Sequence, residues 1–277
     1  MESALERALH DDGAWAHLVE TRQERLRRFL RWAAACEAGT REMSLRLENR
    51  DDIVRCREVV DMFDEPWWAV VVYSCFDSTT GTRVAAPHFR TPMSRVDAER
   101  ALAGLDFPRG SVQHHRAQST LTGARRSLAS ACDKADDIEH VLCQTGVSFD
   151  ERFAQLMKLD VSWWGRTTCF DVLMRAGALA VSGQTYRPVK AYLRGSQGPS
   201  AGFERLWGVR VTASNADLCE ELLRRWTQRW DEVAAAVSLG WEGQPYDSAD
   251  FENALCVFQE PHCAGLPDPR TVQGDTQ

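Results

Sequence analysis

Apolar residues recur every three or four positions along most of this chain, the spacing that places them on one face of an α-helix. Within the first 36 residues, such a face is formed by Leu18, Leu26, Phe29, Leu30 and Ala33. The same spacing predicts helices over 51–63, 95–105, 121–143, 148–159 and 167–175. The pattern therefore predicts a mostly α-helical fold.

One apolar segment, 67–76, has no clear period. Its valines, tyrosine and phenylalanine have a high propensity for strands, so the sequence leaves room for a short β segment near 67–76. The next segment, 77–92, contains Ser-Thr-Thr-Gly and two prolines. These residues favour turns, and we expect a loop there.

Helix boundaries are clearer in the C-terminal half. Pro199 predicts a helix start, because a proline in the first turn sacrifices no helical hydrogen bond. Ser214 and Asp217 approximate a capping box that begins a longer helix ending near Gly240. Asp247 is expected to cap a final helix. The apolar stripe of that helix consists of Phe251, Leu255 and Phe258.

No internal repeat or linker divides the chain. We therefore expect one compact domain over 1–262, with an N-terminal half, 1–159, and a half that carries the candidate motifs, 160–262. The last residues, 263–277, are rich in Pro, Gly and Asp and are expected to form a flexible tail.

Composition argues against several classes of protein. The longest apolar run has seven residues, far below the ~20 that span a bilayer, and the acidic N-terminus is unlike a signal peptide. The nine cysteines include no C-x-x-C pair, so we expect no metal and no cofactor. The sequence predicts a cytoplasmic protein without a membrane partner and shows no evidence of an obligate protein partner.

The net charge of −7 argues against a nucleic-acid partner, but the distribution of charge argues for one. Three windows, 78–96, 107–132 and 172–203, contain no Asp or Glu and several Arg. Charge segregated in this way is what a local anion-binding face requires. The alternative is a general preference for Arg, since the chain has three Lys and thirty Arg.

A glycine-rich turn at 193–202 is the first candidate site. Its glycines allow a ligand to approach the backbone, and the helix that follows presents unpaired N–H groups suited to a phosphate. The residues that would bind the DNA backbone are Lys190, Arg194, Gly195, Gly198, Ser200 and Gly202. The alternative is an ordinary connector between two helices.

A second candidate site is the start of the last helix, where Asp250 and Asn253 share one face. A carboxylate and an amide displayed together could activate a water and orient a base. The alternative is helix capping by Asp247 and Asp250.

The third candidate precedes the helix at 167–175. Trp163 and Trp164 are candidates for stacking on an exposed base, and Arg166 could hold a phosphate. The alternative is that both tryptophans pack against neighbouring helices.

Together, Gly198-Pro-Ser-Ala-Gly202 and the later Asp250, Asn253 and Cys256 resemble motifs of the alpha-glutamyl/putrescinyl thymine pyrophosphorylase group. This group includes the helical domain of hydroxymethyluridine DNA kinases and is distantly related to helix-hairpin-helix DNA glycosylases. The resemblance covers about 160–260. It implies a helical, DNA glycosylase-like domain that flips a modified base out of DNA.

The resemblance implies Asp250 and Asn253 as catalytic residues. Asp217 competes with Asp250, because it follows Gly198 by nineteen residues, near the position of the glycosylase aspartate. No lysine follows the turn to act as a nucleophile, which favours a monofunctional glycosylase, and the glycine spacing differs from that of an ordinary hairpin. No kinase P-loop is present.

The function that we predict is excision of a modified base from duplex DNA, leaving an abasic site. A bulky hypermodified base, such as glucosylated hydroxymethylcytosine, would make this an antiviral defence enzyme. Two alternatives stay open: a base-hypermodifying enzyme of the pyrophosphorylase type, and a non-catalytic helical DNA-binding module.

Overall fold

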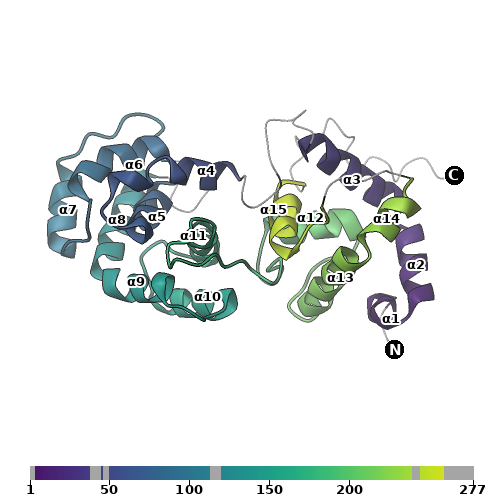
Figure 1. Cartoon of the computed structure of the whole chain (residues 1–277). Coiled ribbons are helices and arrows are strands. Elements are labelled where there is room, and N and C mark those ends of the chain that lie inside the picture. The colour runs from purple at the N-terminus through teal and green to yellow at the C-terminus, as the bar shows by residue number, and fades with distance from the viewer. Residues whose placement is uncertain (1–3, 38–44, 46–49, 113–119, 239–243, 259–277) are drawn as a thin grey trace. The chain divides into compact units, whose positions relative to one another are not determined.

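The computed structural model describes residues 4–37, 45, 50–112, 120–238 and 244–258 (Figure 1). Every regular element in these ranges is an α-helix or a short 3₁₀ helix, and no strand occurs among them. The described part of the chain is therefore all-α, as the apolar periodicity predicted. None of its helices is long and apolar enough to cross a membrane.

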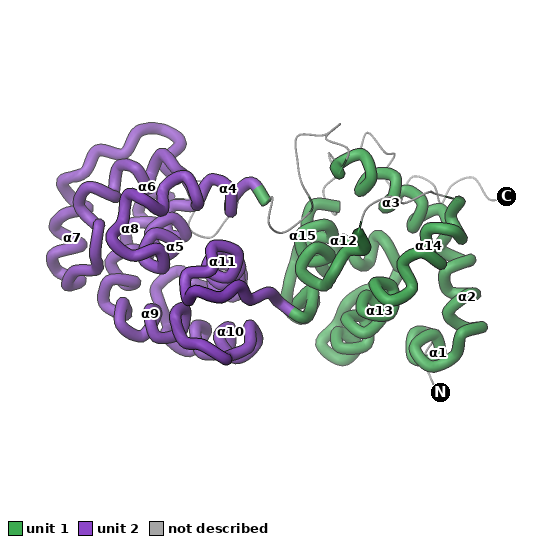
Figure 2. Tube along the Cα trace, viewed as in Figure 1, with its two compact units in different colours: residues 1–50, 189–277 green, residues 51–188 purple. Residues whose placement is uncertain are grey.

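The chain forms two compact units (Figure 2). Unit 1 comprises Met1–Arg50 and Val189–Gln277, and unit 2 comprises Asp51–Pro188. The structure thus differs from the expected division into halves at 159/160, because the first fifty residues group with the last part of the chain. Periodicity shows which face of a helix is apolar, but not which distant helix covers that face. The expected tail, 263–277, lies outside the described residues.

Unit 1 is built from seven described helices. These are α1 (Ala4–His10), α2 (Asp12–Glu20), α3 (Gln23–Glu37), α12 (Gly198–Trp207), α13 (Ala216–Gln228), α14 (Trp230–Ala236) and α15 (Ser248–Phe258). Helix α3 packs against α12 and α14, and α12 packs most extensively against α15. Helices from the two ends of the sequence therefore share one core.

The centre of the unit 1 core is aromatic. Phe29 on α3 lies 5.5 Å from Trp226 and 6.3 Å from Phe251, measured between ring centroids. The rings of Trp226 and Phe251 are 5.0 Å apart. The apolar face predicted for the first 36 residues and the stripe predicted for the last helix are both buried here, which confirms those two predictions.

The long helix expected between Ser214 and Gly240 differs from the prediction in its cap and in its continuity, and Gly240 lies outside the described residues. Its N-cap is Asn215, whose side chain makes no capping hydrogen bond, so the capping box of Ser214 and Asp217 does not form. Instead, Ser214 Oγ is 3.0 Å from Thr212 Oγ1. The helix also breaks at Arg229, which separates α13 from α14.

Unit 2 contains the intervening elements. These are α4 (Asp51–Arg57), η2 (Val60–Met62), α5 (Pro66–Phe76), α6 (Thr79–Ala85), η3 (Ala86–His88), α7 (Arg95–Ala103), α8 (Leu121–Asp133), α9 (Ala135–Cys143), α10 (Phe149–Lys158) and α11 (Arg166–Ala178). Helix α5 is central, with α4, α6, α8, α9 and α11 packed against it.

The β segment considered near 67–76 is wrong, because these residues form α5. All ten residues from Trp67 to Phe76 are buried. A helix surrounded by other helices is apolar on every face, so its sequence loses the period that would identify it. Pro66 in its first turn was the available signal for a helix start.

The loop expected at 77–92 is also partly helical. Ser78 is the N-cap of α6, and its hydroxyl accepts a hydrogen bond from the backbone N–H of Gly81 at 3.5 Å. Gly81 is required by close packing, since a Cβ there would lie 2.1 Å from the carbonyl oxygen of Ser111. The Ser-Thr-Thr-Gly string is therefore a capped helix start rather than a turn.

Arginine side chains satisfy carbonyl groups at the ends of many helices. Arg22 donates to the carbonyl oxygen of Trp207 at 3.0 Å, and Arg205 donates to that of Phe258 at 2.8 Å. In unit 2, the buried Arg152 donates to the carbonyl oxygens of Val141 and Leu142, at 2.6 and 3.1 Å. The last carbonyls of a helix have no partner within it, and a guanidinium with five donors can serve several at once. This packing role accounts for part of the Arg content.

Candidate functional site

The start of α15 brings two acidic side chains together. The backbone N–H of Asp250 donates to Asp247 Oδ1 at 2.9 Å, and the backbone N–H of Asp247 donates to Asp250 Oδ2 at 3.3 Å. This reciprocal arrangement caps the helix, as Asp247 was predicted to do. Asp250 is nonetheless only 3% exposed, so its carboxylate lies within the protein rather than on a solvated first turn.

Asn253 and Glu252 extend this cluster into the interior of unit 1. The amide nitrogen of Asn253 donates to the carbonyl oxygen of Leu45 at 3.1 Å. Glu252 is also buried, and its Oε2 lies 3.8 Å from Nη1 of Arg50. Sequence reasoning missed Glu252 and Arg50. The position of Glu252 beside the apolar stripe of the helix was a weak indication of its burial. Its partner Arg50 lies about two hundred positions away, so no local pattern indicated the pair.

The two motifs of the proposed family resemblance pack directly against each other, because the glycine-bearing face of α12 meets α15. A Cβ added at Gly198 would lie 2.6 Å from Cys256 Sγ. At Gly202 it would lie 2.0 Å from the carbonyl oxygen of Leu255. The absence of a side chain at these two positions is therefore needed for the close approach of the helices.

The backbone before α12 is held by a carboxylate from α13. Glu220 Oε2 accepts a hydrogen bond from the N–H of Ala191 at 2.8 Å, and its Oε1 accepts one from the N–H of Leu193 at 2.6 Å. The residue between them, Tyr192, has a φ of 53°, in the left-handed region. The acid-free window of the sequence thus receives an acid from another helix.

The side chain of Ser200 forms hydrogen bonds with the loop before α12. Its hydroxyl donates to the carbonyl oxygen of Leu193 at 2.6 Å and lies 2.9 Å from the hydroxyl of Ser196. Arg194 remains at the surface, where its Nη2 is 2.8 Å from Oδ2 of Asp217. Asp217 has an 84% exposed side chain, so the two competing acids stand in opposite environments.

The remaining predicted site residues belong to unit 2. Trp164 is buried, and its Nε1 donates to the hydroxyl of Ser127 at 2.9 Å. Trp163 is exposed, and Arg166 is the first residue of α11. The structure therefore divides the predicted residues between the two units, with Lys190, Gly195 and the others in unit 1.

Arginines of the acid-free windows find acidic partners elsewhere in the fold. Arg90 binds Asp64 through two nitrogens, at 2.9 and 2.6 Å, and Arg83 Nη2 lies 3.6 Å from Glu58. Segments that contain no acidic residue in the sequence therefore have acidic neighbours in the folded protein, since folding brings in residues from other segments.

Arg175 is the most deeply buried of these arginines. Its side chain is fully buried in unit 2, where its Nη2 is 2.7 Å from Asp52 and also contacts Asp77. A third bond runs from Nη1 to the hydroxyl of Ser74, at 2.9 Å. Burial alone would lower the pKa of Arg175, but the surrounding carboxylates raise it, so the guanidinium stays charged. No pattern in the sequence indicated this cluster.

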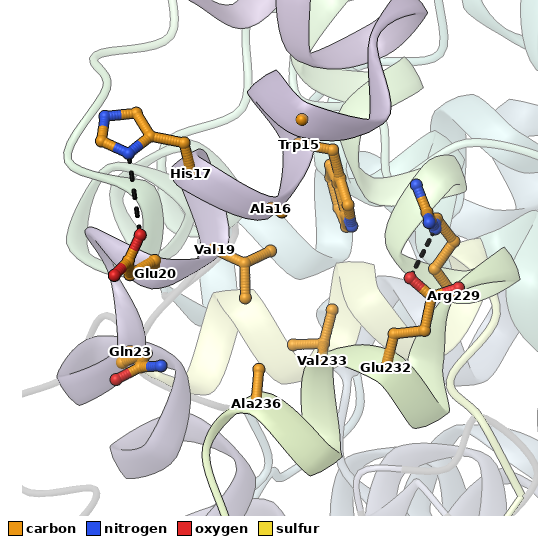
Figure 3. A pocket seen from close by; sticks show the side chains of 11 residues that line it. Trp15, Ala16, His17, Val19, Glu20, Gln23, Arg229, Glu232, Val233 and Ala236 are labelled. Carbon is orange, nitrogen blue, oxygen red and sulfur yellow. Dashed lines mark ion pairs between the residues drawn. The ribbon is translucent and has the colours of Figure 1, made fainter.

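A pocket of about 480 Å³ lies in unit 1 between α2 and α14 (Figure 3). Trp15, Val19 and Val233 supply apolar lining. Ion pairs His17–Glu20 and Arg229–Glu232 lie beside them, at 3.8 and 2.7 Å. None of the predicted catalytic or DNA-binding residues lines this pocket.

Within the described ranges, no three His, Cys, Asp or Glu side chains are grouped so as to hold a metal ion. The fold and the candidate site define a mostly helical protein with a buried acid and amide at the start of its last described helix. No family model, curated protein or solved structure matches the chain.

Proposed function

We propose that this chain is a DNA glycosylase-like enzyme that flips a modified base out of DNA and hydrolyses its N-glycosidic bond, leaving an abasic site. The observation that carries the proposal is the direct packing of α12 on α15, at Gly198 and Cys256 and at Gly202 and Leu255. This packing places the two short motifs that resemble a family of enzymes acting on DNA bases side by side, which supports their belonging to one site.

Asp250 is the catalytic acid that we favour. The residue is only 3% exposed, and a buried carboxylate interacts more strongly with a cationic sugar than a solvated one does. Asp217 is 84% exposed and paired with Arg194, which makes it the weaker candidate. In the proposed reaction, Asp250 stabilises the oxocarbenium-like transition state and orients the attacking water.

Asn253 stands one turn further along the same face of α15. Its bond to the carbonyl oxygen of Leu45 fixes the amide and ties this helix to the N-terminal segment of unit 1. We assign Asn253 to orienting the base or the water rather than to proton transfer, since an amide does not titrate.

The DNA phosphate beside the base is assigned to the turn before α12. Within the described residues, the backbone N–H groups of Gly195, Gln197 and Gly198 have no hydrogen-bond acceptor. Together with the positive end of α12 they suit an anion. Ser200 and Gly202 are better explained by loop structure and helix packing, which reduces the phosphate clamp to the first part of the turn.

A bulky hypermodified base, such as glucosylated hydroxymethylcytosine, is the proposed substrate, and antiviral defence in the cytoplasm is the proposed setting. The mutual hydrogen bonds of Asp247 and Asp250 favour a different assignment, in which the acids only cap α15 and the protein is a non-catalytic DNA-binding module. The experiment must separate these two.

Phage DNAs of different base modification are incubated with the protein and then with alkali, and strand breaks report abasic sites. Asp250→Asn is the decisive variant, because asparagine keeps the oxygen that accepts the Asp247 N–H and removes the charge. We expect this variant to fold normally and to lose at least a hundredfold in cleavage rate. Asp217→Asn and Glu221→Gln, the latter at a half-buried acid of α13, should remain active.

Full activity of Asp250→Asn would reject Asp250 as the acid, and activity lost in Asp217→Asn would transfer the role to that residue. If the wild-type protein produces no abasic site on any modified DNA, excision is wrong. A requirement for an added amine substrate would point instead to the hypermodifying reaction.

A further inference from the structure

Trp163 differs from every other tryptophan that the structure describes. Eight of these nine tryptophans are buried, whereas Trp163 is 43% exposed. Its neighbour Trp164 has the same side chain and lies in the interior, so the difference is not one of sequence composition. An exposed indole forgoes the free energy that burial provides to the others.

The backbone at Trp163 is held in a conformation that is unfavourable for a bulky side chain. Its φ is 69°, in the left-handed region where a residue with a Cβ is strained. Asp160, three positions earlier, also has a positive φ, of 51°. The segment between α10 and α11 thus contains two strained residues. Such strain persists only where the surrounding structure imposes it.

The surrounding structure does impose it, through bonds on both sides of Trp163. The backbone N–H of Ser162 donates to the hydroxyl of Ser130 at 2.9 Å. The indole N–H of Trp164 donates to the hydroxyl of Ser127, also at 2.9 Å, and its backbone N–H donates to the carbonyl oxygen of Val161. Both hydroxyls belong to α8, so the turn is fastened to that helix and Trp163 is left at the surface.

We infer that Trp163 is a stacking platform for an unpaired nucleobase of DNA. A flat, exposed indole provides such a surface for any base, because every base has a π-face. Arg166, three residues further on at the start of α11, supplies a positive charge for the adjoining phosphate. The inference rests on the proposed function only in taking DNA as the ligand, and it needs neither Asp250 nor excision.

A protein partner is the less suitable occupant. A stable protein interface covers roughly 800 Å² on each partner, and its centre is a set of buried apolar residues. Along the chain, Trp163 follows the half-buried Ser162 and precedes the buried Trp164 and the exposed Gly165. A single exposed aromatic side chain offers much less area than such an interface needs, and it suits a single base better.

The test uses the full chain and a single-stranded oligonucleotide that contains 2-aminopurine, whose fluorescence falls on stacking. Four variants are compared with the wild type: Trp163→Phe, Trp163→Ala, Trp163→Gly and Met157→Ala. Met157, an exposed apolar residue of α10, controls for a general loss of surface hydrophobicity.

We expect Trp163→Ala to weaken binding about tenfold and to abolish quenching, and Trp163→Phe to retain most of both. Trp163→Gly should bind as weakly as the alanine variant. Its melting temperature should equal or exceed that of the alanine variant, because glycine tolerates a positive φ. Met157→Ala should behave as the wild type. A residue needed only for packing would instead lose stability and binding together.

The inference is overturned if Trp163→Ala binds the oligonucleotide as the wild type does. It is also overturned if Trp163→Gly unfolds at a clearly lower temperature than Trp163→Ala. It is also overturned if the variants change only self-association in sedimentation. The alkali assay for abasic sites separates the two proposals. Quenching that depends on Trp163 without any abasic site would leave the stacking platform standing and reject excision. If Trp163→Ala excises the base and binds the oligonucleotide as the wild type does, excision stands and the stacking platform is rejected.

Discussion

The close approach of α12 to α15 can be tested by adding a single methyl group. In Gly198→Ala the new Cβ would lie 2.6 Å from Cys256 Sγ and 3.4 Å from the Cα and Cβ of that residue. Non-bonded carbon atoms prefer separations of about 3.5–4.0 Å, and sulfur is larger than carbon. The helices would have to separate by about 1 Å, or the thiol would have to rotate away.

The expected cost follows from two opposing effects. Overpacking in a close contact costs about 1–3 kcal/mol, whereas replacing glycine by alanine in a helix gains up to about 1 kcal/mol. We therefore expect Gly198→Ala to lower the free energy of unfolding by about 1–2 kcal/mol. Urea denaturation followed by circular dichroism would measure it.

Cys256→Ala provides the matched control, because it removes the sulfur and leaves only the contacts at 3.4 Å. We expect the double variant to be about as stable as Cys256→Ala alone, so that the double-mutant cycle shows a coupling of about 1–2 kcal/mol. Gly202→Ala should behave differently. Its Cβ would meet the backbone oxygen of Leu255 at 2.0 Å, and Cys256→Ala cannot relieve that clash. Additive effects of Gly198→Ala and Cys256→Ala would refute the proposed contact.

Two further predictions concern unit 2. Asp52→Asn should lower the free energy of unfolding by about 3–5 kcal/mol, because it leaves the buried Arg175 with less compensating charge. Urea denaturation would measure this change, and an effect below about 1 kcal/mol would contradict the role of this ion pair. Stability should also fall above about pH 9, since burial raises the pKa of Cys56, Cys75 and Cys169 to about 12. The unfolded thiols ionise near pH 9 while the folded ones stay protonated, so each lowers the free energy of unfolding by about 1.4 kcal/mol per pH unit between these values. Urea midpoints at pH 8 and pH 10 would check this, and equal midpoints would contradict it.

Local patterns predicted much of the secondary structure. The helix at α10 was expected from its period and from Ser148, and the structure shows the complete capping box of Ser148 with Glu151. The last helix was expected from Asp247 and its apolar stripe, and α15 has both. These predictions succeeded because a cap and an amphipathic face are properties of residues within one or two turns.

Predictions failed where the environment of a segment decided its structure. Helix α5 carries no period because other helices surround it, and the start of α6 resembles a turn until Ser78 is seen to cap it. The acid-free windows of the sequence show a related effect of folding. Arg90 and Arg194 pair with Asp64 and Asp217, which lie in other parts of the sequence.

The glycine-rich turn shows the same division. Its sequence indicated that a backbone approaches something closely at Gly198 and Gly202, and the structure identifies that partner as α15. A phosphate and a neighbouring helix make the same demand, namely a missing side chain, so the residues alone could not distinguish them.

The sequence by itself determined that the chain is helical, where most of its helices begin, and which faces are apolar, because these depend on interactions between residues close in the chain. Only the tertiary structure decided that the first fifty residues complete the core around α12 and α15. It also decided that Asp250 is buried while Asp217 is exposed, and that Trp163 faces outward while Trp164 does not. Burial and pairing depend on contacts between distant segments, and one sequence does not encode those contacts in any local pattern.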